Sequence, residues 1–401
     1  MKESQATHGR MLMGTLFRGG TVILPTLAGF GRSITDVLVE GGLIAAIEHG
    51  LGNDGHEVVN LEGLVLAPGL IDIHTHGGAG ADTMDAKVDG LRKMASFYAS
   101  HGVTSFCATT MTMEAKRIIA AVHAVREFMS SWKPKDGAQP LGVHLEGPYI
   151  NAKMKGAQPE EYIRTGVELD CRLLFGEDKV VRMITLAPEI EANRPVIEEA
   201  VRRGIIVVAG HCEASYEEMV EAQKMGVNQS THTWNQMKLP HHRHPETVGA
   251  ALQLPGFYAQ LIVDGVHIHP AMVDLSIRAR GTDGILLITD SICGAGMPDG
   301  EYELGGHPIA VKDGEVRLPD GTLAGSALTM DRAVWLAYEF TGLPLEVCVQ
   351  MASWNQVKAL GLSDRGAIAP GMRADLVVLN PEGRVEQTVI AGGTVYKREA
   401  A

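Results

Sequence analysis

Cysteine is scarce in this chain of 401 residues, and its arrangement excludes a disulfide framework. The five cysteines are odd in number, lie far apart and include no Cys-x-x-Cys pair. Small secreted proteins that depend on disulfides show paired, closely spaced cysteines instead. We therefore expect the protein to work in a reducing compartment, the cytoplasm.

Long apolar runs are absent as well. No stretch reaches the ~18 consecutive apolar residues of a membrane-spanning helix. Residues 1–14 are polar and lack the apolar core of a signal peptide. We expect no membrane partner, and we expect the first ten residues to be disordered.

Basic residues are too few for a nucleic-acid-binding surface. The 35 Lys and Arg stand against 48 Asp and Glu, so the formal net charge is −13. Binding to nucleic acid or anionic lipid needs clustered positive charge that displaces counterions. The composition argues against both partners, and an anionic substrate would need a local basic pocket.

The middle of the chain alternates strand-like and helix-like segments. Eight alternating βα units close a (β/α)8 TIM barrel, so we predict an α/β fold with this barrel over residues 67–363. The predicted helices include residues 85–100, 114–130, 193–203, 215–225 and 270–280. The predicted strands are residues 70–76, 103–110, 141–147, 181–187, 204–211, 228–234, 258–265 and 284–290.

The two ends of the chain are β-rich and share the same character. Residues 14–66 and 364–401 consist of short apolar runs broken by glycine and Asn-Asp-Gly turns. Two isolated β segments would each expose unpaired backbone at their edges. We therefore predict that they pair into one small β-sandwich domain built from both termini.

Polar side chains gather where the predicted barrel strands end, which is the catalytic face of such barrels. His74 and His76 are two apart on the first strand, so both point into the barrel mouth. Glu146 ends the third strand, and a carboxylate buried there requires a cation or a hydrogen-bond donor. The fifth, sixth and eighth strands end at His211, His232 and Asp290.

Each of these residues also has an ordinary structural explanation. The two histidines of the first strand could be hydrogen-bonded core residues, and a single strand-end His or Asp could be structural or cap a helix. The combination favours a metal site, because imidazoles and carboxylates are the ligands of Zn²⁺, Fe²⁺ and Mn²⁺. An Asp at this face could also move a proton from water to a leaving amine.

An ordered series of motifs runs from about Gly63 to the end of the chain. The series resembles the amidohydrolase superfamily and, more narrowly, the N-acetylglucosamine-6-phosphate deacetylase family. The resemblance implies hydrolysis of the acetamide of N-acetyl-D-glucosamine 6-phosphate to D-glucosamine 6-phosphate and acetate, in amino-sugar catabolism. The motifs are PGLIDIHTHGGAGAD, GVHLEGPYIN, KGAQ, TLAPE, AGHCEA, STHTWNQM, HHRHP, VDGVHIHP, ITDS and GTLAGSALTM.

The resemblance also implies a role for each strand-end residue. Glu146, His211 and His232 become the ligands of the principal divalent ion. A second ion would be held by Glu146 together with His74, His76 and Asp290. Asp290 becomes the catalytic acid and base, and Zn²⁺ is the first candidate, with Fe²⁺ and Mn²⁺ as alternatives.

Substrate contacts follow from the same resemblance. Arg243 would pair with the sugar phosphate from the neighbouring subunit, which requires a homodimer. An arginine fork suits phosphate, although this histidine-rich stretch could also be an exposed loop that picks up metal ions. The remaining implied substrate contacts are Ala157, Gln158, Asn235, Gln236, Asp264, His267, Leu323, Ala324 and Gly325.

Three departures from the family pattern lie near the sugar. Gln158 stands where many relatives have histidine, Gln236 replaces a small residue, and Arg243 is followed by His-Pro-Glu instead of Glu-Pro-Gly. These departures concern which substrate is bound and leave the metal ligands and Asp290 unchanged. The alternatives are the galactosamine epimer, an N-acyl-D-amino acid, a cyclic amide, or an amino-sugar-binding barrel without turnover. Cyclic amidases bridge their metals with a carboxylated lysine, a place that Glu146 takes here.

Overall fold

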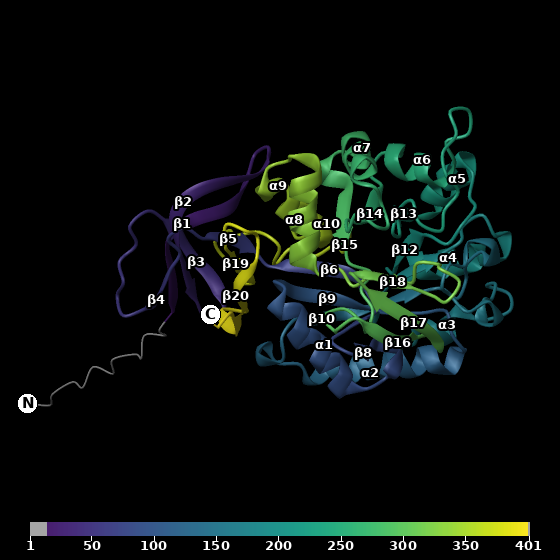
Figure 1. Cartoon of the computed structure of the whole chain (residues 1–401), viewed down its shortest axis with the longest axis horizontal. Helices are drawn as coiled ribbons and strands as arrows, with labels where there is room; N and C mark the ends of the chain where they lie inside the picture. Colours follow the sequence, from purple (N-terminus) through teal and green to yellow (C-terminus); the bar gives the residue numbers. More distant parts are fainter. Residues whose placement is uncertain (1–13, 400–401) are drawn as a thin grey trace, which may run out of the picture.

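A computed structural model describes residues 14–399, which form a large barrel with a smaller sheet at one end (Figure 1). The expected disorder of the first ten residues concerns positions outside this range. No helix between residues 14 and 399 combines the length and apolar character needed to cross a bilayer.

Eight parallel strands form the barrel and confirm the predicted (β/α)8 fold. Their order in the sheet is also their order in the chain, as expected when each strand is followed by a crossover segment. The strands are β6 (Leu70–Thr75), β9 (Val103–Thr110), β10 (Gln139–Glu146), β11 (Val181–Leu186), β12 (Ile206–Ala209), β13 (Val227–Ser230), β14 (Tyr258–Ile262) and β15 (Ile285–Ile288).

The apolar runs form these strands because both faces of the barrel sheet are covered. Every residue of β9 and β15 is buried, which an all-parallel sheet requires. The strands β12, β13 and β15 are shorter than the segments predicted from the sequence, because each ends before the last predicted residues. Their last predicted residues, including His211, His232 and Asp290, instead turn into the barrel mouth.

The barrel closes where β15 meets β6, through contacts beyond the strand pairing. Asp290 donates its backbone N–H to the His74 carbonyl at 2.9 Å, and His76 donates to the Ser291 carbonyl at 2.8 Å. Deeper in the seam, the Thr289 hydroxyl donates to Asp72 at 2.5 Å. The closing contacts thus lie at the end of the strands that carries the polar residues.

Helices surround the barrel, and their ends follow local sequence signals. In α5, the Ser215 hydroxyl accepts from the Glu218 N–H while the Glu218 carboxylate accepts from the Ser215 N–H, and Gly226 ends the helix. The helices are α1 (Val88–Ser100), α2 (Ala115–Ser131), α3 (Cys171–Phe175), α4 (Arg194–Arg202), α5 (Tyr216–Met225), α6 (Glu246–Gln253), α7 (Pro270–Arg280), α8 (Met330–Thr341), α9 (Leu345–Met351) and α10 (Trp354–Ala359).

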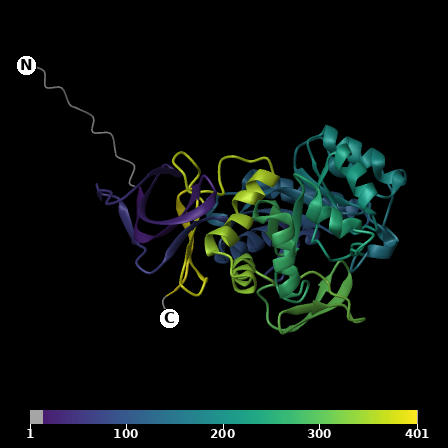
Figure 2. The same cartoon turned by 90° about the horizontal axis from the view of Figure 1, so that it is seen from above.

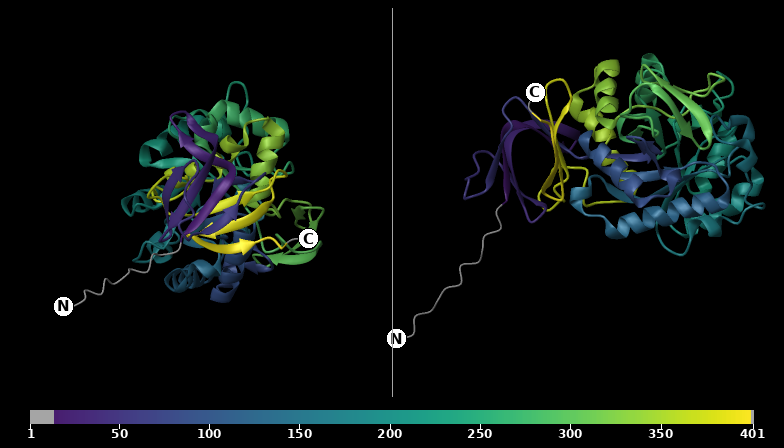
Figure 3. Two further views of the ribbon diagram at one scale, coloured as in Figure 1. Left: turned by 90° about the vertical axis from the view of Figure 1, so that its left-hand side faces the viewer. Right: turned by 60° about the horizontal axis from the view of Figure 1, so that its bottom comes forward.

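Strands from both termini form one eight-stranded sheet, seen edge-on with a curved shape in Figure 3. Residues such as Phe17, Val37 and Leu376 fill its interior. The pairing of both ends agrees with the expected small domain, while its boundaries at residues 66 and 364 stay a prediction. The strands are β1 (Thr15–Thr26), β2 (Gly29–Glu40), β3 (Leu43–Glu48), β4 (Glu57–Asn60), β5 (Val65–Pro68), β19 (Leu376–Leu379), β20 (Val385–Ile390) and β21 (Gly393–Lys397).

A three-stranded antiparallel sheet follows the last barrel strand and was not predicted. It stands beside the barrel in Figure 2, in light green, and its residue Leu304 reaches the cavity at the barrel mouth. Its strands are β16 (Gly300–Leu304), β17 (His307–Lys312) and β18 (Glu315–Arg317).

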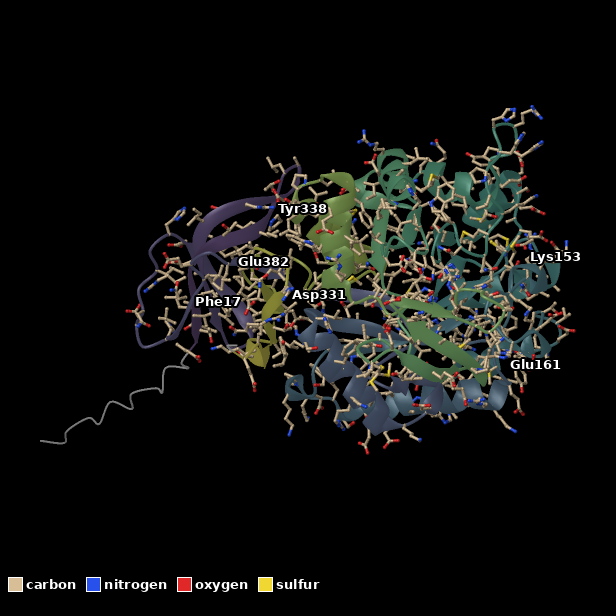
Figure 4. The ribbon with its side chains drawn as sticks, viewed as in Figure 1. Phe17, Lys153, Glu161, Asp331, Tyr338 and Glu382 are labelled. Carbon is tan, nitrogen blue, oxygen red and sulfur yellow. The ribbon has the colours of Figure 1, made fainter. Side chains whose placement is uncertain are left out.

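The terminal sheet and the barrel mouth lie at opposite ends of the molecule. Strand β5 of the terminal sheet leads directly into β6, so the sheet adjoins the amino ends of the barrel strands. In Figure 4, Phe17 marks the terminal sheet, whereas Lys153 and Glu161, in the loop after β10, mark the far end of the barrel. The chemistry is therefore positioned by the loops at the carboxyl ends of the strands.

Candidate active site

The carboxylate of Glu146 is the centre of a buried cluster of imidazoles. Its Oε1 atom lies 3.3 Å from Nε2 of His74, 3.3 Å from Nε2 of His211 and 3.1 Å from Nε2 of His232. Its Oε2 atom lies 3.4 Å from Nε2 of His76. All five side chains are buried, although they come from four different strand ends.

The other ring nitrogen of two histidines is bound to a backbone carbonyl. Nδ1 of His211 contacts the Met154 carbonyl at 2.8 Å, and Nδ1 of His232 contacts the Asn235 carbonyl at 3.2 Å. A carbonyl only accepts, so each Nδ1 carries a hydrogen, and the neutral imidazole then presents its lone pair at Nε2. This is the arrangement in which imidazole binds a metal.

The two lone pairs face each other closely. Nε2 of His211 and Nε2 of His232 are 3.1 Å apart, and both also face the Glu146 carboxylate. Such a set needs a cation between its atoms to be stable when buried. Two nitrogens bound to one tetrahedral Zn²⁺ would be separated by roughly 3.3 Å, so the donor set fits a divalent ion.

A second set of metal-competent donors adjoins the first and shares Glu146. It comprises His74, His76 and Glu146, with Asp290 Oδ1 at 3.3 Å from Nε2 of His74 and 3.1 Å from Nε2 of His76. Burial lowers the pKa of His76, but the hydrogen bonds and charges of Asp290 and Glu146 raise it to about 9. The carboxylates therefore favour a positive charge at this position.

The acid at this site stays ionised. Burial raises the pKa of Asp290, but the charges and hydrogen bonds of His74 and His76 lower it further, well below its usual value. Burial also raises the pKa of Glu146, but the charge of His74 and the hydrogen bond and charge of His211 lower it well below its usual value. Both side chains can therefore act as anionic ligands or proton acceptors at neutral pH.

Backbone conformation directs three of these residues into the mouth. His211, His232 and Asp290 each lie two residues past the end of a strand, and their φ angles are +48°, +24° and +51°. Non-glycine residues rarely adopt positive φ, and such positions cluster at functional sites because the surrounding structure must hold them there. The turn out of the strand is what brings their side chains together.

A cavity opens beside the cluster. Of the residues predicted from the sequence, His74 lies buried beneath the cavity and Ala324 is buried without lining it. Asp264 lies behind His267, and Arg243 is exposed elsewhere. The predicted residues that line it are His76, Glu146, Ala157, Gln158, His211, His232, Asn235, Gln236, His267, Asp290, Leu323 and Gly325.

Gln158, one of the three departures, is fixed within the cluster. Its amide donates to Glu146 Oε2 at 2.6 Å and its carbonyl oxygen accepts from the Thr112 N–H at 2.7 Å. An amide here holds the Glu146 carboxylate in place. Gln236, another departure, has a φ of +50° and also lines the cavity.

His267 is oriented by Asp264, and both residues lie in the turn that follows β14. Asp264 Oδ2 contacts His267 Nδ1 at 2.6 Å, and its Oδ1 accepts the N–H groups of Val266 and His267 at 2.8 Å each. Burial lowers the pKa of His267, but the hydrogen bond and charge of Asp264 raise it. Asp264 thus fixes the imidazole at the wall of the cavity through its Nδ1 atom.

Arg243 does not reach the cavity of its own chain. It is exposed on the loop between β13 and α6, which projects from the barrel in Figure 1, and its guanidinium lies 2.7 Å from the neighbouring His242 ring. Among residues 14–399, no Lys or Arg lines the cavity.

Sequence reasoning missed the buried polar residues that support the cluster. Gln260 and Thr231 both contact Nδ1 of His74, at 3.1 Å and 2.9 Å, and Asp72 ties the strand of His74 to Thr289. A signal was present, because Gln260 interrupts an otherwise apolar strand. A buried polar side chain needs a partner, and that need marks it as part of a network.

Comparison with known proteins shows the family. The amidohydrolase family profile matches residues 65–395. The chain belongs to the amidohydrolase family. The N-acetylglucosamine-6-phosphate deacetylase of Lysinibacillus sphaericus is 39% identical, covering 89% of this chain and 92% of its own length. The N-acetylgalactosamine-6-phosphate deacetylase of Escherichia coli O157:H7 is 37% identical, covering 88% and 93%.

A solved structure of the amidohydrolase family superimposes on nearly the whole chain. It is a mutant N-acetyl-D-glucosamine-6-phosphate deacetylase from Mycobacterium smegmatis in complex with N-acetyl-D-glucosamine-6-phosphate. The TM-score is 0.88 at 30% identity, covering 96% of this chain and 100% of the other. The resemblance predicted from the motifs is confirmed, and the chain is a hydrolase that acts on amide bonds.

Proposed function

We propose that this amidohydrolase removes the acetyl group of N-acetyl-D-glucosamine 6-phosphate, releasing D-glucosamine 6-phosphate and acetate. One observation carries the proposal: four histidines, Glu146 and Asp290 form one buried cluster beside the cavity, with the Nε2 atoms of the histidines facing the two carboxylates. The relatives and the sugar phosphate bound in the similar structure support this substrate.

The metal chemistry follows from the donor set. Glu146, His211 and His232 would hold one ion, and His74, His76 and Asp290 would hold a second with Glu146 as the shared ligand. A bound divalent ion lowers the pKa of water from 15.7 toward about 7 and polarises a carbonyl oxygen. We favour Zn²⁺, which matches the nitrogen and carboxylate ligands, over Fe²⁺ or Mn²⁺.

Asp290 would move the proton in the reaction. Its carboxylate is ionised and faces the cavity, so it can accept the proton of the attacking water. It would then donate that proton to the departing amine, which breaks the carbon–nitrogen bond. A cysteine nucleophile is disfavoured because burial raises the pKa of the nearby Cys293 thiol to about 11.

The sugar would be held by residues around the mouth. His267, oriented by Asp264, would donate to a sugar oxygen. Ala157, Gln158, Asn235, Gln236 and the segment Leu323–Gly325 would form the remaining walls, partly through backbone groups. The cavity lining within residues 14–399 lacks a Lys or Arg for the phosphate, which supports supply of Arg243 by a second subunit in a cytoplasmic homodimer.

The galactosamine epimer is the nearest alternative substrate, because one relative of 37% identity is a deacetylase of N-acetylgalactosamine 6-phosphate. The test is acetate release from both epimers, each with and without the 6-phosphate, by protein loaded with Zn²⁺, Fe²⁺ or Mn²⁺. We expect the highest kcat/KM for the glucosamine phosphate. A higher value for the epimer would reassign the substrate.

The same assay separates the enzyme from a sugar-binding barrel without turnover. Binding of the sugar phosphates with no acetate release from any metal-loaded form would contradict the proposal. Removal of the metal with a chelator should abolish acetate release, and adding Zn²⁺ back should restore it.

A further inference from the structure

His211 depends on a distant part of the chain for its orientation. The carbonyl that binds its Nδ1 belongs to Met154, 57 residues earlier, whereas the carbonyl that binds His232 Nδ1 belongs to Asn235, three residues later. Met154 lies in a short 3-10 turn, η3 (Ala152–Met154), in the loop after β10. Other contacts must therefore hold the loop after β10 beside His211.

Asn151 connects the loop to His211 in two ways. Its backbone N–H donates to the His211 carbonyl at 2.9 Å. Its side-chain oxygen accepts the Lys153 N–H at 3.0 Å and so caps the turn that carries Met154. The carbonyl of Asn151 also accepts the Met154 N–H at 2.9 Å, which closes the turn that carries Met154.

Glu189 in turn holds Asn151. Its Oε1 atom accepts from the Asn151 side-chain amide at 2.9 Å and from the Glu213 N–H at 2.7 Å. Glu213 is two residues after His211, so this one oxygen joins the loop after β10 to the loop after β12. Glu189 and Asn151 come from the motifs TLAPE and GPYIN, to which no role has been given above.

We propose that Asn151 and Glu189 are positioning residues that fix His211 as a metal ligand. They keep the Met154 carbonyl on Nδ1, so the His211 hydrogen stays on that nitrogen and the Nε2 lone pair faces Glu146. This inference rests on the proposed metal site. Partners of this kind set the orientation and basicity of a metal-binding imidazole.

The test measures the affinity of the metal-stripped full-length protein for Zn²⁺ alone, by competition with a chromophoric chelator. Asn151→Ala and Glu189→Ala should weaken Zn²⁺ binding by about 10–100-fold. Glu189→Gln keeps an oxygen that accepts both N–H groups and should bind Zn²⁺ nearly as the wild type does. Glu191→Ala, an exposed carboxylate two residues further on, is the matched control.

Asn151→Asp provides a second variant if an alanine variant fails to fold. It keeps the cap on η3 but cannot donate to Glu189, and it should weaken Zn²⁺ binding as well. Circular dichroism of the metal-free proteins would show that the fold is intact. A change in Zn²⁺ affinity would then reflect the orientation of His211.

Zn²⁺ binding by both alanine variants within twofold of the wild type would overturn the inference, as would equal weakening in Glu191→Ala. A wild-type protein that binds no Zn²⁺ would overturn the metal site of the proposed function and this inference with it. Failure of the positioning role alone leaves the wild-type affinity intact, so the two failures are distinguishable.

Discussion

At the scale of single residues, the direction of one hydrogen bond decides what a side chain can do. Each Nδ1 of His211 and His232 is committed to a carbonyl, which leaves the other nitrogen for a cation. For Asp290 the negative charge matters instead of a hydrogen-bond direction. Its Oδ1 atom faces the Nε2 atoms of two imidazoles, those of His74 and His76.

Replacing Asp290 with asparagine tests that charge. Asp290→Asn keeps the size and the backbone turn but cannot accept a proton from water, so kcat should fall by about 10²–10⁴-fold. Metal analysis should still find the ion held by Glu146, His211 and His232. Asp54→Asn, on an exposed turn of the terminal sheet, is the control, and unchanged turnover in Asp290→Asn would contradict its role.

The Asp264–His267 pair predicts a pH dependence of stability. The pair raises the pKa of His267 and, against the opposing effect of burial, lowers that of Asp264. Its stabilisation is complete between the unfolded values, about 3.9 for Asp and about 6.5 for His. It is lost as the pH rises through the folded pKa of His267 or falls through that of Asp264.

Asp264→Asn should therefore lower the free energy of unfolding most in mildly acidic solution. We expect a loss of about 1.5–3 kcal/mol at about pH 6 and a smaller loss in alkaline solution above the folded pKa of His267, where the histidine is neutral in both proteins. Denaturant unfolding at the two pH values measures the difference. An equal loss at both would show that charge has no part in the pair.

At the scale of elements, the seam between β6 and β15 positions His74, His76 and Asp290 of the second donor set. Asp72 accepts from the His74 N–H at 3.2 Å, from the Thr289 hydroxyl at 2.5 Å and from the Thr289 N–H at 3.4 Å. Burial raises the pKa of Asp72 to about 6, although these hydrogen bonds oppose the rise. One side chain thus joins the first strand to the last beneath the catalytic face.

Removing this side chain should loosen the seam. Asp72→Ala leaves buried donors without a partner, at a cost of about 1–3 kcal/mol for each, and Tm should fall. Asp72→Asn keeps one acceptor oxygen and should lose less. Thermal unfolding monitored by circular dichroism measures both, and an alanine variant as stable as the wild type would argue against a structural role for the seam contacts.

At the scale of the whole molecule, the terminal sheet and the candidate active site lie at opposite ends of the barrel. The segment that leads from α10 into the terminal sheet is tied to two barrel strands, because its Arg365 guanidinium donates to Ser105 of β9 and Gln139 of β10 at 2.8 Å each. The cavity lies at the other end, and the exposed Arg243 loop projects from the side of the barrel (Figure 1).

A mixing experiment tests whether Arg243 acts across a dimer interface. Arg243→Ala should raise KM for the phosphorylated sugar, equivalent to about 2–5 kcal/mol, and leave the unphosphorylated sugar nearly unaffected. When Arg243→Ala and Asp290→Asn chains are refolded together, a mixed dimer regains one complete site only if Arg243 reaches the partner. Absence of any recovery in confirmed mixed dimers would place Arg243 outside the neighbouring site.

Much of the architecture was predictable from the sequence because the signals are local. All eight barrel strands and five of the helices follow from apolar runs and end signals such as Ser215 and Gly226. The sheet of β16–β18 was missed, since its strands are short and partly exposed and lie outside the repeating βα pattern.

The sequence by itself determined which residues end the strands, because the period of a strand and the barrel topology place them on one face. Only the tertiary structure decided their orientation. The left-handed turns at His211 and Asp290, the carbonyl of Met154 on an imidazole 57 residues away, and the seam at Asp72 all depend on contacts between segments distant in the chain. Local patterns carry no information about such contacts, since the energy that holds them comes from packing the whole barrel.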